Sequence, residues 1–396
     1  MSFLKEMAEL SIGNARLVLF KEGIEILKGI VYMRDGIIQD IKEEGDFEID
    51  AEGRCMIPGL IDPHTHLVFS GRRTQEFEKR LKGKTYEEIA AEGGGILSTV
   101  QATRETAEDT LFTLSLKRVL SLLKKGITTV EIKSGYGLDI SSEMKILKVI
   151  KRIEKELPLN ISKTFLGAHA FPLEYKREEY VEVLIKEMLP KAKEYAEFCD
   201  VFCDRIAFSP EESLLILEEA KKYGMRPKIH ADELSYSEGA EVAARVGAVS
   251  ADHLVYSSRE GLRRMKENNV TPVLLPATSF FLGESKKPDL EFLREEGINF
   301  AIGSDFNPGS SPYLSPFLVM HIGCIHYGLT IEESIKGMSI WAAKALGIEK
   351  RKGSIEKGKD ADLVILDTDD FRDIIYMPEY EWVLKVIING EIVYER

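Results

Sequence analysis

The pattern of hydrophobic and polar positions divides the chain into two kinds of region. At both ends, short β-branched runs without helical periodicity predict strands, at Ala15–Phe20, Gly29–Met33, Ala361–Leu366, Leu384–Ile388 and Glu391–Tyr394. Turn signals stand beside them, in Arg34-Asp-Gly36 and in the pair Asn389-Gly390. Because the two ends share this texture, we predict that residues 1–56 and 351–396 pair into one small β-sandwich module.

In residues 57–350, apolar β-branched runs alternate with helical stretches such as Glu212–Lys222 and Leu290–Glu296. The eight candidate strands are Met56–Ile61, Ile127–Ile132, Ser162–Leu166, Phe198–Phe202, Pro227–Ile229, Ala248–Ala251, Thr271–Leu275 and Asn299–Ile302. Eight such units predict an α/β fold of the (β/α)8 TIM-barrel type. A doubly wound open sheet is the main alternative, but it gives no reason for the count of eight.

Composition narrows the class of protein. The 396 residues, 44% hydrophobic and 30% charged, are enough for one large catalytic domain and a smaller module. The formal net charge of −13, without a Lys/Arg cluster interleaved with aromatic residues, argues against nucleic-acid binding. We expect no signal peptide and no membrane span, and the four cysteines form no CxxC pair. We therefore expect a cytoplasmic protein whose cysteines are mainly small core residues.

Polar side chains follow most of the predicted barrel strands. The residues at these strand ends are His64 and His66, Lys133 and Tyr136, His169, His230 and Glu233, His253, and Asp305. Of the seven histidines in the chain, only His321 and His326 lie elsewhere. A lone histidine is usually a satisfied structural residue, but in a barrel all of these positions converge on one face. The joint pattern therefore predicts an active site there.

The first two histidines suggest a metal site. His64 and His66 stand one strand period apart, so their rings are expected to leave the same face of a strand. With His230 and Asp305 they offer three imidazoles and one carboxylate, a set that suits Zn²⁺ or Fe²⁺. A bound divalent ion would lower the pKa of its water, and Asp305 would accept a hydrogen bond from that water. The fourth strand carries no lysine that could be carboxylated to bridge two metals, which favours one ion.

Three other strand-end residues have assignable roles. Glu233 lies three residues beyond His230, and we interpret it as the group that shuttles a proton to a leaving nitrogen. The alternative for Glu233 is an ordinary acidic residue at the start of a helix. His253 either polarises a substrate carbonyl or orients a neighbouring ligand. Lys133 is interpreted as a structural or electrostatic residue.

Several of these motifs are similar to those of a known enzyme family. Pro58–His66, Gly303–Asp305 and Gly353–Asp367 resemble the first metal motif, the last metal motif and the return segment of the amidohydrolase superfamily. Within it, six stretches resemble the imidazolonepropionase family: Phe69–Arg73, Gly93–Ile96, Glu131–Leu138, Thr164–Ala170, Lys228–Glu233 and Ser304–Ser310. The resemblance spans nearly the whole chain and implies a metal-dependent hydrolase.

The resemblance also implies a substrate and its contacts. Enzymes of this family open the cyclic amide of 4-imidazolone-5-propanoate to N-formimidoyl-L-glutamate in histidine degradation. By resemblance, one Zn²⁺ or Fe³⁺ ion would be held by His64, His66, His230 and Asp305. The substrate would contact Arg73, Tyr136, His169 and Glu233, with Asn307, Gly309 and Ser310 around the product-like end of the site. Glu233 would move the proton and His253 would help to stabilise the oxyanion.

The forked guanidinium of Arg73 suits the propanoate carboxylate, and Tyr86 is a further candidate for the same pocket. A homodimer is expected from the resemblance. The nearest alternative is another mononuclear amidohydrolase, such as a deaminase of a heterocyclic base, for which Arg73 would have no carboxylate to bind. A non-catalytic barrel used as a binding scaffold is a second alternative, and the complete set of metal and proton-transfer candidates argues against it.

Overall fold

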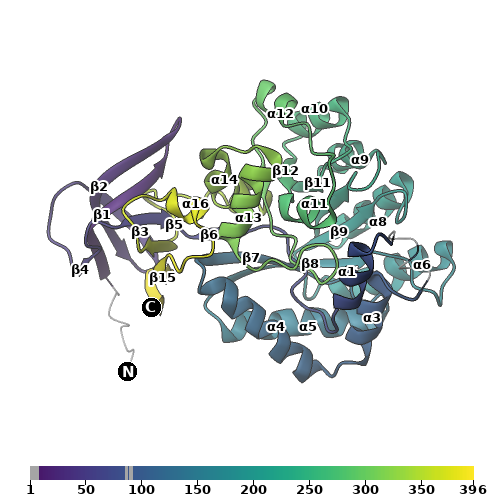
Figure 1. Cartoon of the computed structure of the whole chain (residues 1–396). Coiled ribbons are helices and arrows are strands. Elements are labelled where there is room, and N and C mark those ends of the chain that lie inside the picture. Colours follow the sequence, from purple (N-terminus) through teal and green to yellow (C-terminus); the bar gives the residue numbers. More distant parts are fainter. Residues whose placement is uncertain (1–8, 85–87, 89–91) are drawn as a thin grey trace.

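A closed parallel barrel forms the larger part of the protein (Figure 1). The computed structural model describes residues 9–84, 88 and 92–396. The barrel strands follow one another in chain order: β6 (Leu60–Asp62), β7 (Ile127–Lys133), β8 (Asn160–Ala168), β9 (Phe198–Cys203), β10 (Arg226–Ala231), β11 (Ser250–His253), β12 (Thr271–Leu274) and β13 (Ala301–Ile302). A parallel bridge between Thr65 and Phe306, just beyond β6 and β13, joins the last strand to the first. The predicted (β/α)8 fold is confirmed.

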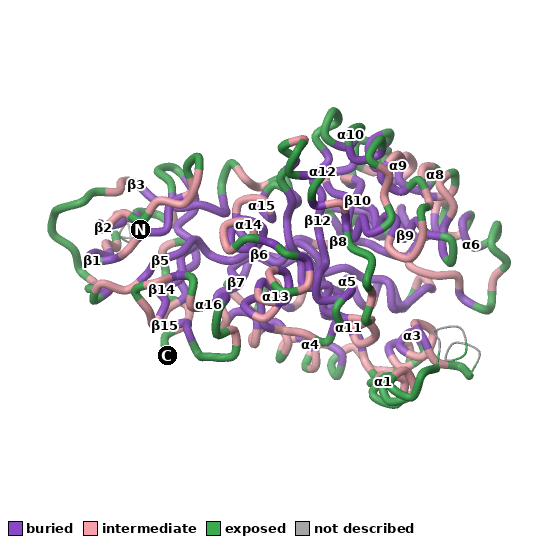
Figure 2. Tube along the Cα trace, turned by 45° about the horizontal axis from the view of Figure 1, so that its top comes forward, coloured by how far each residue is buried: buried purple, intermediate pink, exposed green. Residues whose placement is uncertain are grey.

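Helices cover the outside of the barrel and alternate with its strands, as the periodicity predicts. They are α3 (Ile96–Glu105), α4 (Glu108–Leu123), α5 (Ile140–Glu156), α6 (Arg177–Val183), α7 (Leu189–Ala192), α8 (Pro210–Lys222), α9 (Gly239–Val246), α10 (Arg259–Glu267), α11 (Pro276–Leu282), α12 (Leu290–Glu295), α13 (Pro316–Ile322), α14 (Ile331–Gly337) and α15 (Ile340–Ala345). Two π-helical turns, η1 (Leu184–Met188) and η2 (Gly323–Tyr327), interrupt this helical layer. Figure 2 shows buried strands inside and exposed helix surfaces outside.

A second sheet unites the two ends of the chain, so that purple and yellow strands lie side by side in Figure 1. It contains β1 (Glu9–Phe20), β2 (Ile24–Arg34), β3 (Ile37–Lys42), β4 (Ile49–Asp50), β5 (Cys55–Pro58), β14 (Leu363–Leu366), β15 (Val383–Ile388) and β16 (Glu391–Glu395), with α16 (Asp373–Tyr376) beside it. We call it the terminal sheet. Its strands enclose their own apolar cluster, which includes Leu17, Met56 and Leu363.

The first predicted barrel strand is wrong in one respect. Met56–Ile61 was expected to be continuous, but it divides at Gly59 into β5 of the terminal sheet and β6 of the barrel. Gly59 donates its N–H to Asp362 O, and a Cβ at this position would lie 2.2 Å from Thr128 Oγ1. Only glycine allows the chain to pass this closely between the two sheets.

Successive side chains of the barrel strands point alternately into the barrel and toward the surrounding helices, and most are buried on both sides. The carboxyl ends of the strands meet at one rim. All four cysteines are free thiols, and Cys55, Cys199 and Cys203 are buried, as expected for core residues. Within the described part of the chain, no helix combines the length and the apolar character needed to cross a bilayer.

Candidate active site

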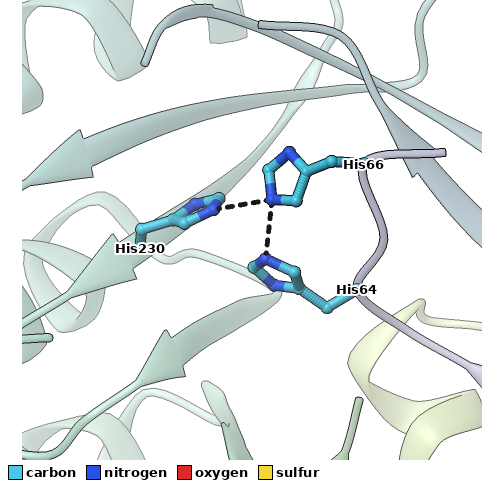
Figure 3. Close-up of side chains that lie close together, drawn as sticks. All are labelled: His64, His66 and His230. Carbon is cyan, nitrogen blue, oxygen red and sulfur yellow. Dashed lines mark hydrogen bonds between the residues drawn. The ribbon is translucent and has the colours of Figure 1, made fainter. Parts of the chain in front are cut away.

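Three histidines meet at the carboxyl-end rim of the barrel, and Figure 3 shows their rings pointing toward one another. His66 Nε2 lies 3.2 Å from His64 Nε2 and 3.4 Å from His230 Nε2. Asp305 joins them from the loop after β13: its Oδ1 is 3.5 Å from His64 Nε2 and 3.3 Å from His66 Nε2. The four residues that were predicted as a ligand set therefore converge.

These groups fit a bound cation. His64 Nδ1 lies 2.6 Å from Asp252 Oδ2, which favours the proton on Nδ1 and leaves a lone pair on Nε2. Imidazole lone pairs and a carboxylate oxygen this close repel one another unless a positive charge stands among them. His66 Nδ1 is buried and has no hydrogen-bond partner among the described residues. The donor set of three nitrogens and one oxygen is one that zinc and iron accept.

The loops that follow the strands, rather than the strands themselves, carry two of these histidines. β6 ends at Asp62, so His64 and His66 lie beyond it, on either side of the bridging Thr65. The expectation that both belong to one strand is therefore wrong, although their rings still face one point. Asp62 Oδ1 accepts the backbone N–H of Ser304 at 3.0 Å, which ties this loop to the one that carries Asp305.

A large cavity opens beside the histidines, with a volume of about 730 Å³. This is the size expected of a small-molecule site. Of the residues predicted from the sequence, the cavity is lined by His66, Arg73, Tyr136, His169, His230, Glu233, His253, Asp305, Asn307, Gly309 and Ser310. His64 is fully buried behind them. Tyr86 lies outside the described residues.

Glu233 and His253 form a pair at the wall of this cavity. Glu233 Oε1 is 3.6 Å from His253 Nδ1, and the two residues come from the segments after β10 and at the end of β11. Burial and the nearby charge of Asp305 raise the pKa of Glu233 well above its ordinary value. Burial lowers the pKa of His253 to about 4. Burial thus favours the neutral form of both the Glu233 carboxyl and the His253 imidazole.

Tyr136 and His169 form the opposite wall. The rings of His66 and His169 are stacked with centroids 5.1 Å apart, and Tyr136 lies 5.4 Å from His169. Glu143, fully buried, accepts the N–H groups of Gly135, Gly137 and Leu138 and so fixes the loop that presents Tyr136. Sequence reasoning missed Glu143, because an acidic residue in an amphipathic helix carries no local sign of such a role.

Arg73 reaches the cavity from the start of α1 (Thr74–Leu81). Its Nε donates to Glu76 Oε2 at 2.8 Å, and a Cβ at Gly309 would lie 2.0 Å from Arg73 Nη1. Gly309 is therefore needed for the guanidinium to fit. Asn307 shapes this loop, because its Oδ1 accepts the N–H groups of both Gly309 and Ser310 at 2.8 Å.

A second guanidinium beside Arg73 escaped the sequence analysis. Arg80 Nη2 donates to Gly309 O at 3.1 Å, and Arg80 also lines the cavity. The signal was present, because Arg73 and Arg80 stand two helical turns apart and therefore share one face of α1. Lys84 and Arg205 add further positive charge to the lining. Arg73 and Lys84 are paired with Glu76 and Glu92, whereas Arg80 has no ion pair within 4.0 Å among the described residues, so the region around Arg73 and Arg80 can bind an anionic ligand.

Charged side chains also lie beneath the histidines, inside the barrel. Asp252 contacts His64, and Asp200 Oδ2 lies 3.0 Å from His230 Nδ1, outside the direction of an aligned hydrogen bond. Lys133, which was expected just past its strand, is the last residue of β7 and has no exposed surface. Lys133 was predicted from the sequence as a structural or electrostatic residue, whereas Asp200 and Asp252 were not predicted.

The two remaining histidines lie away from this centre, as expected. His321 Nδ1 is 2.9 Å from Ile375 O, and His326 belongs to the π-helical turn η2. Neither lines the cavity.

Comparison with known proteins agrees with this geometry. Residues 55–393 match the model of the amidohydrolase family. An imidazolonepropionase from Geobacillus sp. (strain WCH70) is 43% identical over 96% of this chain and 94% of its own, and one from Geobacillus kaustophilus is 47% identical over 87% and 82%. An imidazolonepropionase from Shewanella sp. (strain MR-4) is 46% identical over 87% of this chain and 85% of its own.

Solved structures support the fold. A 5-methylcytosine deaminase from Klebsiella pneumoniae superimposes with a TM-score of 0.77 at 19% identity, covering 98% of both chains. A guanine deaminase from C. acetobutylicum has a TM-score of 0.72 at 18% identity, covering 98% of this chain and all of the other. Their likeness concerns the fold alone, whereas the sequence relatives decide the subgroup. The chain belongs to the amidohydrolase family, which is metal-dependent, and within it to the imidazolonepropionases.

Proposed function

We propose that this protein hydrolyses the cyclic amide of 4-imidazolone-5-propanoate to N-formimidoyl-L-glutamate, a step of histidine degradation. The observation that carries the proposal is one cavity lined both by members of a metal-ligand cluster and by Arg73. The first can open an amide and the second can bind a carboxylate. Relatives named imidazolonepropionase, 43% to 47% identical to this chain, support the same substrate.

The residues proposed to hold the metal are His64, His66, His230 and Asp305, around one zinc or iron ion. When bound, the ion would supply an electrophile for the amide carbonyl and would lower the pKa of water at the site. Asp305 has one oxygen fixed by Thr278 Oγ1 at 2.7 Å, and its other oxygen faces the histidines. In this position Asp305 would also accept a proton from the attacking water.

The substrate is proposed to lie between the histidine cluster and α1. Arg73 would bind the propanoate carboxylate with its terminal nitrogens, because Arg73 lines the cavity and its Nε already donates to Glu76. Tyr136 and His169 would pack against the ring. His169 Nδ1 donates to Gly135 O at 3.0 Å, so its Nε2 would accept a hydrogen bond from the substrate, while the Tyr136 hydroxyl could donate one. Asn307, Gly309 and Ser310 would enclose the end of the cavity beside Arg73, where the carboxylate remains after the ring has opened.

Glu233 and His253 are proposed to complete the chemistry. Burial and the charge of Asp305 raise the pKa of Glu233, so its carboxyl group can give a proton to the nitrogen that leaves the carbonyl carbon. Water oxygen adds to that carbon, the C–N bond breaks, and a new carboxyl group forms, which then loses its remaining proton to solvent. His253, buried and neutral, can donate a hydrogen bond to the oxygen that becomes negative. The proton that Asp305 takes from water balances the one that Glu233 gives.

A direct assay tests the proposal. Imidazolone ring opening is followed by the loss of its ultraviolet absorbance, with protein as purified, after treatment with a chelator and after metal is restored. We expect the purified protein to turn over the imidazolone, the chelator-treated protein to be inactive, and the activity to return when metal is restored. Guanine and cytosine serve as control substrates, because the fold neighbours include deaminases. Selective deamination of a base, with no ring opening, would contradict the proposed substrate.

Metal analysis of protein purified without chelator decides between zinc and iron, both of which accept this donor set.

We also propose that the protein acts in the cytoplasm as a homodimer. Large apolar side chains remain exposed on the single chain, among them Ile325 and Tyr376, and the cysteines are free. Sedimentation analysis at several concentrations tests the dimer.

A further inference from the structure

The interior of the barrel holds a group of charged side chains with no exposed surface. They are Glu131 and Lys133 on β7, Asp200 on β9, Lys228 on β10 and Asp252 on β11. We call them the buried charge cluster. Barrel interiors are usually filled by branched apolar side chains. Burying charged groups costs solvation free energy, and well-packed apolar residues often give equal or greater stability. Stability alone therefore gives no reason for this cluster.

Lys133 lies at the centre of the cluster. Its Nζ is 2.7 Å from Asp200 Oδ2, 3.0 Å from the carboxylate of Glu131 and 3.5 Å from Asp252 Oδ2. β7, β9 and β11 are alternate strands of the barrel, so their inward side chains share one layer. One ammonium group thus joins carboxylates from two other strands, neither of which is a neighbour of β7 in the sheet.

The same two oxygen atoms also face the histidines. Asp252 Oδ2 is 2.6 Å from His64 Nδ1, and Asp200 Oδ2 is 3.0 Å from His230 Nδ1. The remaining oxygens are fixed elsewhere: Asp252 Oδ1 accepts from Ser250 Oγ at 2.7 Å, and Asp200 Oδ1 accepts the backbone N–H of His230 at 3.1 Å. Each carboxylate therefore stands between Lys133 and one imidazole.

This arrangement favours Nε2 as the nitrogen that faces the proposed metal. His64 Nδ1 is hydrogen-bonded to Asp252, whereas His230 Nδ1 has the charge of Asp200 beside it without an aligned hydrogen bond. A carboxylate beside Nδ1 favours the proton there and directs Nε2 outward as a ligand. Two carboxylates close to each other repel, and without a cation between them they would move apart. Such a movement would alter the orientation or the tautomer of the imidazoles.

We propose that Lys133 is a positioning residue for the metal ligands: its ammonium group holds Asp200 and Asp252 together, so that His64 and His230 present Nε2 to one point. The inference rests on the proposed ligand set. Lys133 itself does not line the cavity. Its ammonium group forms ion pairs with carboxylates, and through them it acts on the imidazoles.

Lys228 on β10 provides a control, because it is a second buried lysine of the cluster. It is also fully buried, and its Nζ contacts Glu131 Oε2 at 2.8 Å and Pro63 O at 3.2 Å. Among the described residues, no contact within 4.0 Å joins it to Asp200 or Asp252. Removing Lys228 deletes a buried positive charge of the same kind but leaves Lys133 between the two carboxylates.

The test measures metal affinity rather than turnover. Full-length wild-type protein, Lys133→Met and Lys228→Met are stripped of metal and titrated with Zn²⁺ against a chromophoric chelator, after circular dichroism has shown that each is folded. We expect Lys133→Met to bind Zn²⁺ about 10- to 100-fold more weakly than wild type. Lys228→Met removes a charge that acts on Asp252 only from beyond 4.0 Å, so we expect it to weaken Zn²⁺ binding clearly less than Lys133→Met, and both variants to lose thermal stability.

A second variant covers the case in which Lys133→Met does not fold. Lys133→Gln keeps a hydrogen-bond donor but removes the charge, and we expect its Zn²⁺ affinity to fall clearly below that of Lys228→Met. Equal affinities of the Lys133 and Lys228 variants, or wild-type affinity in a folded Lys133 variant, would overturn the inference. If wild-type protein itself binds no Zn²⁺ or iron, the proposed ligand set fails instead, which is a different outcome.

Discussion

The core of the terminal sheet and the interior of the barrel are both buried, but they differ in the side chains they hold. In the terminal sheet, Leu17 and Leu363 belong to an apolar cluster that both ends of the chain enclose. In the barrel, the buried charge cluster occupies positions beneath the proposed metal site. The apolar cluster of the terminal sheet stabilises the fold through burial of apolar surface. The buried charge cluster costs solvation free energy, and its proposed role is to orient side chains. Burial by itself therefore does not distinguish a structural core from the support of a reactive site.

Replacing one carboxylate in each region should give the largest difference between the barrel and the terminal sheet, because one variant should lose turnover and the other stability. Asp305→Asn removes a proposed ligand and proton acceptor, so we expect the turnover number to fall at least about 10³-fold while the protein stays folded. The matched control is Asp360→Asn at the edge of the terminal sheet, where Asp360 Oδ2 pairs with Lys352 Nζ at 2.8 Å. That variant should lose stability but keep its turnover number. Wild-type turnover by Asp305→Asn would refute the mechanism.

Arg73→Ala tests the cavity wall rather than the barrel interior. Hydrogen bonds to a charged group contribute about 1.5 to 3 kcal/mol, so we expect the KM for the imidazolone to rise about 10- to 150-fold with a much smaller change in kcat. Lys82→Ala is the control on the same helix, because its side chain is 70% exposed. A large fall in kcat with unchanged KM would place Arg73 in the chemical step instead.

The apolar side of the comparison is tested at Leu17, which has no exposed surface. Leu17→Ala should lower the free energy of unfolding by about 2 to 5 kcal/mol, because it leaves a cavity in the terminal sheet. At 25 °C, where the folded form still dominates, kcat/KM should not change. Denaturant titration and steady-state kinetics on the same preparation provide both values. A parallel loss of activity in the folded protein would show that the terminal sheet also shapes the site.

The smallest expected difference between the two regions is in the reactivity of their buried cysteine thiols, one of which lies in each region. Burial raises the pKa of Cys55 on β5 to about 11 and that of Cys203 on β9 to about 12. Both thiols stay neutral below these values, and the thiolate is the reactive form. We expect neither to react with a thiol reagent at pH 8 until the protein is unfolded. Mass spectrometry of labelled peptides would identify the sites, and rapid native labelling of either cysteine would contradict their burial.

Local sequence was enough for the strands and the site histidines. A strand or helix is specified by periodicity over a few residues, so the predicted runs fall on β7 to β13 with small shifts at their ends. The exception at Gly59 has a tertiary cause, because the break depends on the approach of Thr128 from another strand. His64, His66, His230 and Asp305 were found because strand ends of a barrel converge whatever lies between them.

The contacts of the buried charge cluster could not be predicted from the sequence in the same way. Lys133 meets Asp200 and Asp252 across separations of 67 and 119 residues, and the sequence gives no local sign of either contact. A charge within an otherwise apolar strand, as at Asp200 and Lys228, was the one available signal. It indicates that a partner exists, but it does not identify that partner.

The sequence by itself determined the barrel, the pairing of both chain ends and the residue types of the site, because each depends on short-range periodicity or on a motif. The tertiary structure decided how these residues act together: the 3.2 and 3.4 Å approaches of the imidazoles, the approach of Arg80 to Gly309 beside Arg73, and the place of Lys133 between two carboxylates. These depend on the closure of the barrel, which brings distant strands to within hydrogen-bond distance of one another.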